Sequence, residues 1–473
     1  MPVDLSNPRQ QILLREVVFA SVVALLVVLP ALFSLGIAAW ALVGSLLAFS
    51  FVHPRALLFA VPLTIPLSFH AVEVSDLEFN MLELLILAAA IGYAPRILSG
   101  AWQLRGIEAE QRHMLMLRLV PDRLAAGIAI LLLIAGGLSL LFIADGSYAA
   151  ESLRTFRWTI LFPVAYFFLA APIIVQRDEF RNLAAALLIG GGVIAALVAI
   201  VDGLLGGGVQ ADAVTRLSGM APHPNALALV LDRVAVMGIL IGILFRQQLD
   251  RLWLVPSILI TIVVMLTFSR GAILGLAAGI LIILILVRAR RMAVAIAGAS
   301  ITGVVGMALV APERTLSLLG GGSGSLRLEL WDSSVQMIRD HPLAGVGPDQ
   351  FLYQYLPRYV TPEAWPERFT SHPHNLVLDA WLSVGIIGVA VIILIVGLVF
   401  RNARVSLQAR DRVALAAAGA IITAGVHGVV DQSYFLPELA TSLWLLIILL
   451  IPPVVLDQDE AEPQPEIETE GQE

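Results

Sequence analysis

Three short polar segments between long apolar runs carry the residue types that could do chemistry. The first contains Arg216 and Asn225, the second contains Arg270, and the third is a Ser-His-Pro-His-Asn run that includes His372 and His374. A guanidinium binds phosphate oxygens through a planar fork of N–H donors. A histidine can take up a proton near neutral pH. Together these residue types predict an anion-binding site that contains a general base.

Each segment also has a purely structural interpretation. Arg216 can be a snorkelling arginine beside a turn, with Asn225 at or near a helix N-cap. Arg270 lies in an almost loop-free connection and can belong to a tight helical hairpin, although a charge so close to hydrocarbon tends to face a protein cavity. A lone pair such as His374 and Asn375 is more often structural than catalytic. Taken singly, the segments leave both interpretations open.

One charged pair falls inside an apolar run rather than between runs. Asp232 and Arg233 are neighbours, and neighbouring side chains on a helix point about 100° apart, so the two need not pair with each other. Charges inside a membrane span are candidates for function, and a buried structural network is equally compatible with the pattern. Asp202, near the end of the preceding run, is a candidate partner.

The apolar runs predict the elements that must position these residues. About 20 apolar residues in a helix cross a bilayer. The sequence therefore predicts an all-α polytopic integral membrane protein with about 12–14 transmembrane helices and one long outer loop that contains an amphipathic helix. The predicted spans are residues 15–33, 35–52, 55–70, 80–94, 123–144, 156–174, 183–204, 224–245, 252–268, 271–287, 292–311, 375–399, 413–430 and 438–456.

The composition excludes several classes of protein. Of 473 residues, 59% are hydrophobic and 14% are charged, and the mean hydropathy of +0.89 excludes a soluble globular enzyme and a disordered chain. The absence of cysteine excludes disulfides and thiolate metal sites. The sequence contains no nucleotide-binding loop, which argues against ATP-driven transport. We expect no metal, no cofactor and no nucleic-acid partner. All 29 basic residues are arginine, so guanidinium groups would meet any bound anion.

Arginine bias predicts the orientation of the chain. With the N-terminus in the cytoplasm, 19 of the 29 arginines fall on the inner side. An even number of spans then places the C-terminus in the cytoplasm too. The predicted divisions are N-terminal transmembrane helices (1–94), a cytoplasmic amphipathic connection (95–122), central transmembrane helices (123–311), a large periplasmic or extracellular loop (312–373), C-terminal transmembrane helices (374–456) and a disordered acidic cytoplasmic tail (457–473).

The long outer loop has predicted structure of its own. Ser325 can cap a helix that runs from Leu326 to Asp340, and Pro342 follows its end. A loop of this length between spans is usually functional. The predicted apolar face of the loop helix comprises Leu330, Val335 and Ile338.

These features, in this order, resemble the O-antigen ligase and polymerase superfamily over about residues 180–430. Its members are bacterial inner-membrane glycosyltransferases that use undecaprenyl-diphosphate-linked glycans. The ligase signature reads here as His374-Asn375, nine residues, Gly385, two residues and Gly388. The further matching segments are Arg216 to Asn225, Ser269-Arg270-Gly271, and the loop pattern Arg327, Trp331, Pro342-Leu343 and Gly345-Val346-Gly347. The chain departs from the family in its predicted 14 spans, against about 12, and in the pair Asp232 and Arg233.

The resemblance implies a reaction and a role for each residue. His374 would be the catalytic base that removes a proton from the acceptor hydroxyl, and Arg216 and Arg270 would bind the donor diphosphate. The transfer would invert the anomeric centre and need no metal. The further candidates for substrate binding are Arg327, Asn225, His372 and Asn375.

The resemblance also implies partners and a location. The donor would be an undecaprenyl-diphosphate-linked glycan, the acceptor would be lipid A core or another glycan, and the site would lie on the periplasmic or outer face of the bacterial inner membrane. The signature favours a ligase over a polymerase of the same superfamily. Two other functions compete: a membrane transporter, to which Asp232 and Arg233 would be central, and a scaffold for polysaccharide assembly.

Overall fold

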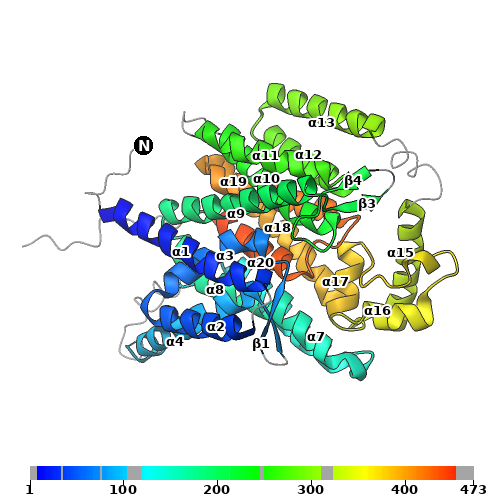
Figure 1. Ribbon diagram of the computed structural model, residues 1–473, viewed down its shortest axis with the longest axis horizontal. Helices are drawn as coiled ribbons and strands as arrows, with labels where there is room; N and C mark the ends of the chain where they lie inside the picture. The colour runs from blue at the N-terminus through cyan, green and yellow to red at the C-terminus, as the bar shows by residue number, and fades with distance from the viewer. Residues whose placement is uncertain are drawn as a thin grey trace, which may run out of the picture.

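The computed structural model describes residues 8–33, 36–74, 77–103, 119–211, 214–244, 250–310 and 323–453. Within these residues the protein is almost entirely helical (Figure 1). Most helices run across the view (Figure 1). Four elements gather at one end, which we call the loop end: α15 (Ser323–Asp340), α16 (Phe351–Gln354) and the hairpin of β3 (Val209–Ala211) and β4 (Val214–Arg216) (Figure 1). The predicted acidic tail and residues 104–118 of the predicted amphipathic connection lie outside the described residues.

The helices follow the predicted apolar runs in order. The first group comprises α1 (Pro8–Phe33), α2 (Gly36–Val52), α3 (Pro54–Thr64), α4 (Met81–Gln103), α6 (Arg123–Ser139), α7 (Ala149–Phe156), α8 (Phe162–Ile174) and α9 (Asp178–Leu204). The second group comprises α10 (Pro224–Ile243), α11 (Leu254–Leu266), α12 (Arg270–Leu286), α13 (Arg290–Val310), α15 (Ser323–Asp340), α16 (Phe351–Gln354), α17 (Leu376–Val384), α18 (Ile386–Ala409), α19 (Arg412–Gly428) and α20 (Pro437–Leu450).

Length and composition identify a polytopic membrane protein. Five helical stretches of the described chain are long and apolar enough to cross a membrane, and shorter apolar helices accompany them. The five stretches are Arg123–Phe142, Gly146–Ile174, Asp178–Leu204, Pro224–Ile243 and Ile386–Ala409. The prediction of an all-α membrane protein is confirmed.

Two short hairpins were not expected from the sequence. Strand β1 (Ala71–Val74) pairs antiparallel with β2 (Leu77–Asn80), and β3 (Val209–Ala211) pairs antiparallel with β4 (Val214–Arg216). Strands this short carry too little alternation of apolar and polar residues to be recognised among long apolar runs. The second hairpin matters for the site, because Arg216 is its last residue.

Glycines allow the central helices α12 and α19 to pack closely. A Cβ atom on Gly279 would lie 2.1 Å from Thr423 Oγ1, and one on Gly275 would lie 2.9 Å from the Thr423 carbonyl oxygen. Such small residues let two helix backbones approach each other inside a membrane. The same contact brings the start of α12 against the end of α19, where the ring of His427 lies.

The predicted span at residues 375–399 is broken in two at Gly385. This residue has φ 75° and separates α17 from α18. A Cβ atom on Gly385 would lie 2.1 Å from the Leu343 carbonyl oxygen, and Ile386 N–H donates to that oxygen at 3.1 Å. The break therefore receives the loop segment that follows α15. The nine residues between Asn375 and Gly385 form the whole of α17.

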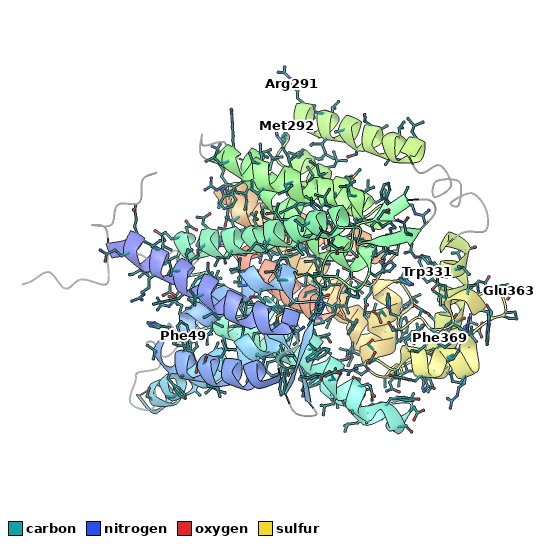
Figure 2. All side chains as sticks on the ribbon, in the orientation of Figure 1. Phe49, Arg291, Met292, Trp331, Glu363 and Phe369 are labelled. Atoms are coloured by element: carbon teal, nitrogen blue, oxygen red, sulfur yellow. The ribbon has the colours of Figure 1, made fainter. Side chains whose placement is uncertain are left out.

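The loop helix α15 begins at Ser323, two residues before the predicted cap Ser325. Its buried face includes the predicted Leu330 and Ile338, which pack with Phe351, Tyr355 and Leu382 in a small core of their own. The prediction for Val335 is wrong: its side chain is exposed, and Met337 is buried instead. Figure 2 shows Trp331, Glu363 and Phe369 together at the loop end, and Trp331 Nε1–H donates to the Pro373 carbonyl oxygen at 3.1 Å.

The break at Gly385 generates a stability prediction. Gly385→Ala introduces a side chain at φ 75° and against the Leu343 carbonyl, and should lower the free energy of unfolding by at least about 2 kcal/mol. Gly397→Ala on the same helix is the matched control, because a Cβ atom there meets nothing within 4 Å. Thermal unfolding of the detergent-solubilised protein measures both. Equal midpoints for the two variants would contradict the account.

Candidate active site

A polar cavity of about 280 Å³ lies at the loop end and gathers residues from distant parts of the chain. Five of the predicted site residues line it: Arg216, Asn225, Arg270, Arg327 and His374. The cavity also contains residues for which the sequence analysis gave no role: Ser269, Glu367, His427 and Asp431.

Two matching turns present the site residues. Phe268 and His374 both adopt a left-handed backbone with φ 52°, and each directly precedes a helix N-cap. Left-handed backbone at residues other than glycine is uncommon and collects at functional sites, because surrounding contacts must hold it in place. The first turn places Ser269 and Arg270 at the start of α12, and the second places His374 at the start of α17.

Asn375 stabilises the second turn. Its Oδ1 accepts from the backbone N–H groups of Val377 at 3.0 Å and Leu378 at 3.1 Å, as expected of an N-cap. Its Nδ2–H donates to the Val429 carbonyl oxygen at 3.0 Å. The side chain therefore ties the start of α17 to the segment that follows α19, and it does not line the cavity.

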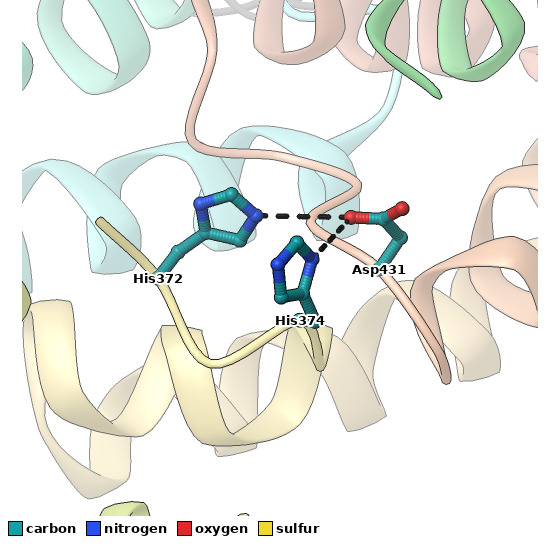
Figure 3. A group of neighbouring side chains, drawn as sticks. All are labelled: His372, His374 and Asp431. Atoms are coloured by element: carbon teal, nitrogen blue, oxygen red, sulfur yellow. Dashed lines mark hydrogen bonds and ion pairs between the residues drawn. The ribbon is translucent and has the colours of Figure 1, made fainter. Parts of the chain in front are cut away.

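The carboxylate of Asp431 is the centre of the site (Figure 3). Its Oδ1 accepts from His374 Nδ1 at 2.9 Å and lies 3.7 Å from His372 Nε2. Its Oδ2 accepts from Asn225 Nδ2 at 3.0 Å and lies 3.6 Å from Arg327 Nη2. One carboxylate thus connects three segments that are far apart in the sequence.

The electrostatics of Asp431 follow from these contacts. Burial raises the pKa of the carboxyl, but the hydrogen bonds and charges of His372 and His374 outweigh burial and hold the pKa well below its ordinary value. Asp431 is therefore ionised at neutral pH. A carboxylate on Nδ1 fixes the histidine tautomer and leaves Nε2 of His374 as the acceptor nitrogen.

Arg216 is locked at the opposite end of the same network. Its side chain is buried, its Nε–H donates to the Thr267 carbonyl oxygen at 2.7 Å, and Nη2–H donates to Asn225 Oδ1 at 2.6 Å. The predicted N-cap role of Asn225 belongs instead to His223, whose Nδ1 accepts from Asn225 N–H at 3.2 Å. Asn225 links Arg216 to Asp431.

The charge of the cavity favours an anion. Three arginines line it, Arg216, Arg270 and Arg327, against two carboxylates, Asp431 and Glu367. Guanidinium groups fixed by hydrogen bonds are well suited to phosphate oxygens, which accept several N–H donors at once.

One group of side chains could in principle hold a metal ion. Ligand atoms of His372, His374 and Asp431 all lie within 4.8 Å of one another. However, the second oxygen of Asp431 already faces Arg327 and Asn225, and a cation would share the cavity with three guanidinium groups. The arrangement matches a histidine oriented by a carboxylate better than a metal centre.

The side chains of the intramembrane pair, Asp232 and Arg233, bind different partners. His427 Nδ1 lies 2.6 Å from Asp232 Oδ2, and the candidate partner Asp202 is not among the residues that bind Asp232 or Arg233 in the described part of the chain. Arg233 donates from Nη1 to Ser442 Oγ at 2.9 Å and ties α10 to α20. The side chains of adjacent helix residues diverge, as expected.

The comparison with protein families matches the region that contains His374. Residues 255–393 match the O-antigen ligase family. The matched segment contains Arg270, Arg327, His372 and His374, whereas Arg216, Asn225 and Asp431 reach the cavity from outside it. No curated protein matches the chain. The match over this segment supports the resemblance of the chain to the O-antigen ligase and polymerase superfamily.

Proposed function

We propose that the protein is an inverting, metal-independent glycosyltransferase of the O-antigen ligase type. It transfers a glycan from an undecaprenyl-diphosphate donor to an acceptor hydroxyl. The observation that carries the proposal is the pairing of His374 with Asp431 in a cavity that also contains Arg216 and Arg270.

His374 is the general base of the proposed reaction. Asp431 accepts a hydrogen bond from His374 Nδ1–H, so Nε2 can take the proton of the acceptor hydroxyl as its oxygen attacks the anomeric carbon. The bond between the anomeric carbon and the diphosphate oxygen breaks, and its electron pair leaves on that oxygen. Asp431 stabilises the imidazolium that forms. A single displacement of this kind inverts the anomeric centre.

The arginines act on the leaving group. Arg216 is held by Thr267 and Asn225, and Arg270 starts α12 at the cavity wall. Fixed positive groups stabilise charge that develops as the diphosphate departs, without having to reorganise. Arg327 reaches the same cavity from α15 and contacts Asp431, so we assign it to substrate binding at the base.

An apolar groove supports a lipid-linked substrate. A cavity of about 480 Å³ follows one face of α18 from Gly388 to Leu407, which is about 28 Å along the helix and close to the thickness of a hydrocarbon core. Its walls include Leu376, two residues after His374, and the exposed side chains of Val396 and Phe400. A polyprenyl chain is the matching occupant.

The subtype and the location complete the proposal. We assign the protein to the bacterial inner membrane, with both termini cytoplasmic and the loop end facing the periplasm or the cell exterior. The acceptor is lipid A core or another glycan. A deletion strain separates the two members of the superfamily: long chains stranded on the lipid carrier indicate a ligase, and single repeats indicate a polymerase. The intramembrane pair does not favour a transporter, because Asp232 and Arg233 both have fixed protein partners.

His374→Ala should lower the rate of glycan transfer by about 10²–10⁴-fold, since it removes the base. Purified protein with a lipid-diphosphate donor and an acceptor glycan provides the measurement. His341→Ala is the control, because His341 lies at the loop end but does not line the cavity. Wild-type transfer by the His374 variant at equal membrane levels would rule out the base.

Asp431→Asn keeps the size of the side chain and removes its charge. Loss of the charge that orients and stabilises the protonated ring should reduce kcat by about 10²-fold or more. Asp332→Asn, on the exposed face of α15 where the carboxylate binds only Gln336 in the described chain, should leave kcat unchanged. Equal kcat values for the two variants would count against the role of Asp431.

Removal of divalent ions separates the two interpretations of the histidine cluster. The proposed reaction uses a histidine as the base and arginines to stabilise the leaving diphosphate. Dialysis against EDTA should therefore leave the transfer rate unchanged. Loss of activity that zinc or manganese restores would instead assign His372, His374 and Asp431 to a metal centre.

A further inference from the structure

A second buried hydrogen-bonded chain reaches the cavity from the membrane interior. Asp232 on α10 is fully buried, and its Oδ2 lies 2.6 Å from His427 Nδ1 near the end of α19. Nε2 of His427 lies 3.4 Å from Ser269 Oγ at the start of α12. His427 and Ser269 both line the cavity that contains Arg216 and Arg270.

Close packing at the start of α12 brings the His427 ring against Gly271 and Ser269. A Cβ atom on Gly271 would lie 2.5 Å from His427 Cδ2 and 2.8 Å from Nε2, so only glycine admits the ring there. Ser269 occupies the N-cap position of α12, yet its hydroxyl makes no capping hydrogen bond. The hydroxyl is directed toward His427 instead. A polar chain inside a span is costly unless it has a function.

The charged groups around this hydrogen-bonded chain come from α10, α12 and α20 and from the far side of the cavity. From α10, Asp232 binds its ring, and Arg233 lies 4.0 Å from Asp232 while bound to Ser442. From α12, Arg270 lines the same cavity. The remaining titratable neighbours are Glu438, buried on α20, and Asp431 and His374 across the cavity.

We propose that Ser269 donates a hydrogen bond to the departing diphosphate, and that Asp232 and His427 position it to do so. The proposal rests on the proposed function. Asp232 holds the His427 ring through Nδ1, and in the proposed arrangement the ring donates from Nε2–H to Ser269 Oγ. The serine hydrogen is then available for a phosphate oxygen. Ser269 touches the substrate, whereas His427 and Asp232 act through it.

The order Asp, His, Ser would also suit a nucleophilic serine. That alternative requires two displacements and retention of anomeric configuration. His374 and Asp431 already provide a base for direct attack by the acceptor, so the proposed reaction needs no nucleophilic serine. A donor role for Ser269 therefore accounts for both chains.

Steady-state kinetics with the full-length protein and a lipid-diphosphate donor test the inference. Ser269→Ala should lower kcat about tenfold to a hundredfold, with the donor KM little changed, because the bond strengthens as charge develops. Ser269→Thr should retain most of the activity. Ser257→Ala is the matched control, since Ser257 is buried on α11 and binds the Trp253 carbonyl oxygen away from the cavity.

A double-variant cycle separates this role from a structural one. His427→Asn should lower kcat as Ser269→Ala does, and the double variant should be no slower than the slower single variant, because both changes break one chain.

The outcomes distinguish the inference from the function it rests on. Absence of transfer by the wild-type protein would overturn the proposed function. Retention of the anomeric configuration would also overturn the proposed inverting reaction. Inverting transfer by the wild-type protein together with an unchanged kcat in Ser269→Ala, or with multiplicative losses in the double variant, would overturn the inference alone. If His427→Asn fails to fold, the comparison of Ser269→Ala with Ser269→Thr still decides it.

Discussion

The candidate site depends on the hydrogen bonds and ion pairs of the Asp431 carboxylate. It accepts a hydrogen bond from Nδ1 of His374, and it is connected to Arg216 through Asn225. The same carboxylate therefore helps to position both His374 and Arg216. Removal of this carboxylate would leave Arg327 and two histidines without their common negative charge. Breaking a buried charge network in this way costs far more than the network contributes to stability when intact.

The network forms because of the way in which the helices pack. Glycines on α12 allow α19 to approach, and the chain that leaves α19 then carries Asp431 to the start of α17. The break at Gly385 receives the segment after α15, which holds the loop helix and Arg327 over the cavity. Two left-handed turns, at Phe268 and His374, aim the residues that follow them. Backbone features outside the cavity therefore position His374.

Much of the fold was predictable because apolar runs are a strong signal in a membrane protein. Arg216, Arg270 and His374 could also be predicted as site residues, because charged and titratable residues at span boundaries stand out in the sequence. Asp431 was missed although it follows the predicted span 413–430 at the expected outer boundary, where a single carboxylate in a short connection could have been noted. His427 lies within an apolar helix, and its partnership with Asp232 depends on helix packing that sequence spacing does not encode. The break at Gly385 was missed for the same reason: the apolar run is continuous, and only the docked loop explains the glycine.

The central claim is that an acceptor hydroxyl, deprotonated by His374, displaces the diphosphate directly. The most direct measurement is the anomeric configuration of the new glycosidic bond, determined by NMR on product made by purified protein from a lipid-diphosphate donor of defined configuration. The account predicts inversion, with one lipid diphosphate released for each bond formed. Retention of configuration, or a new bond without release of lipid diphosphate, would contradict it.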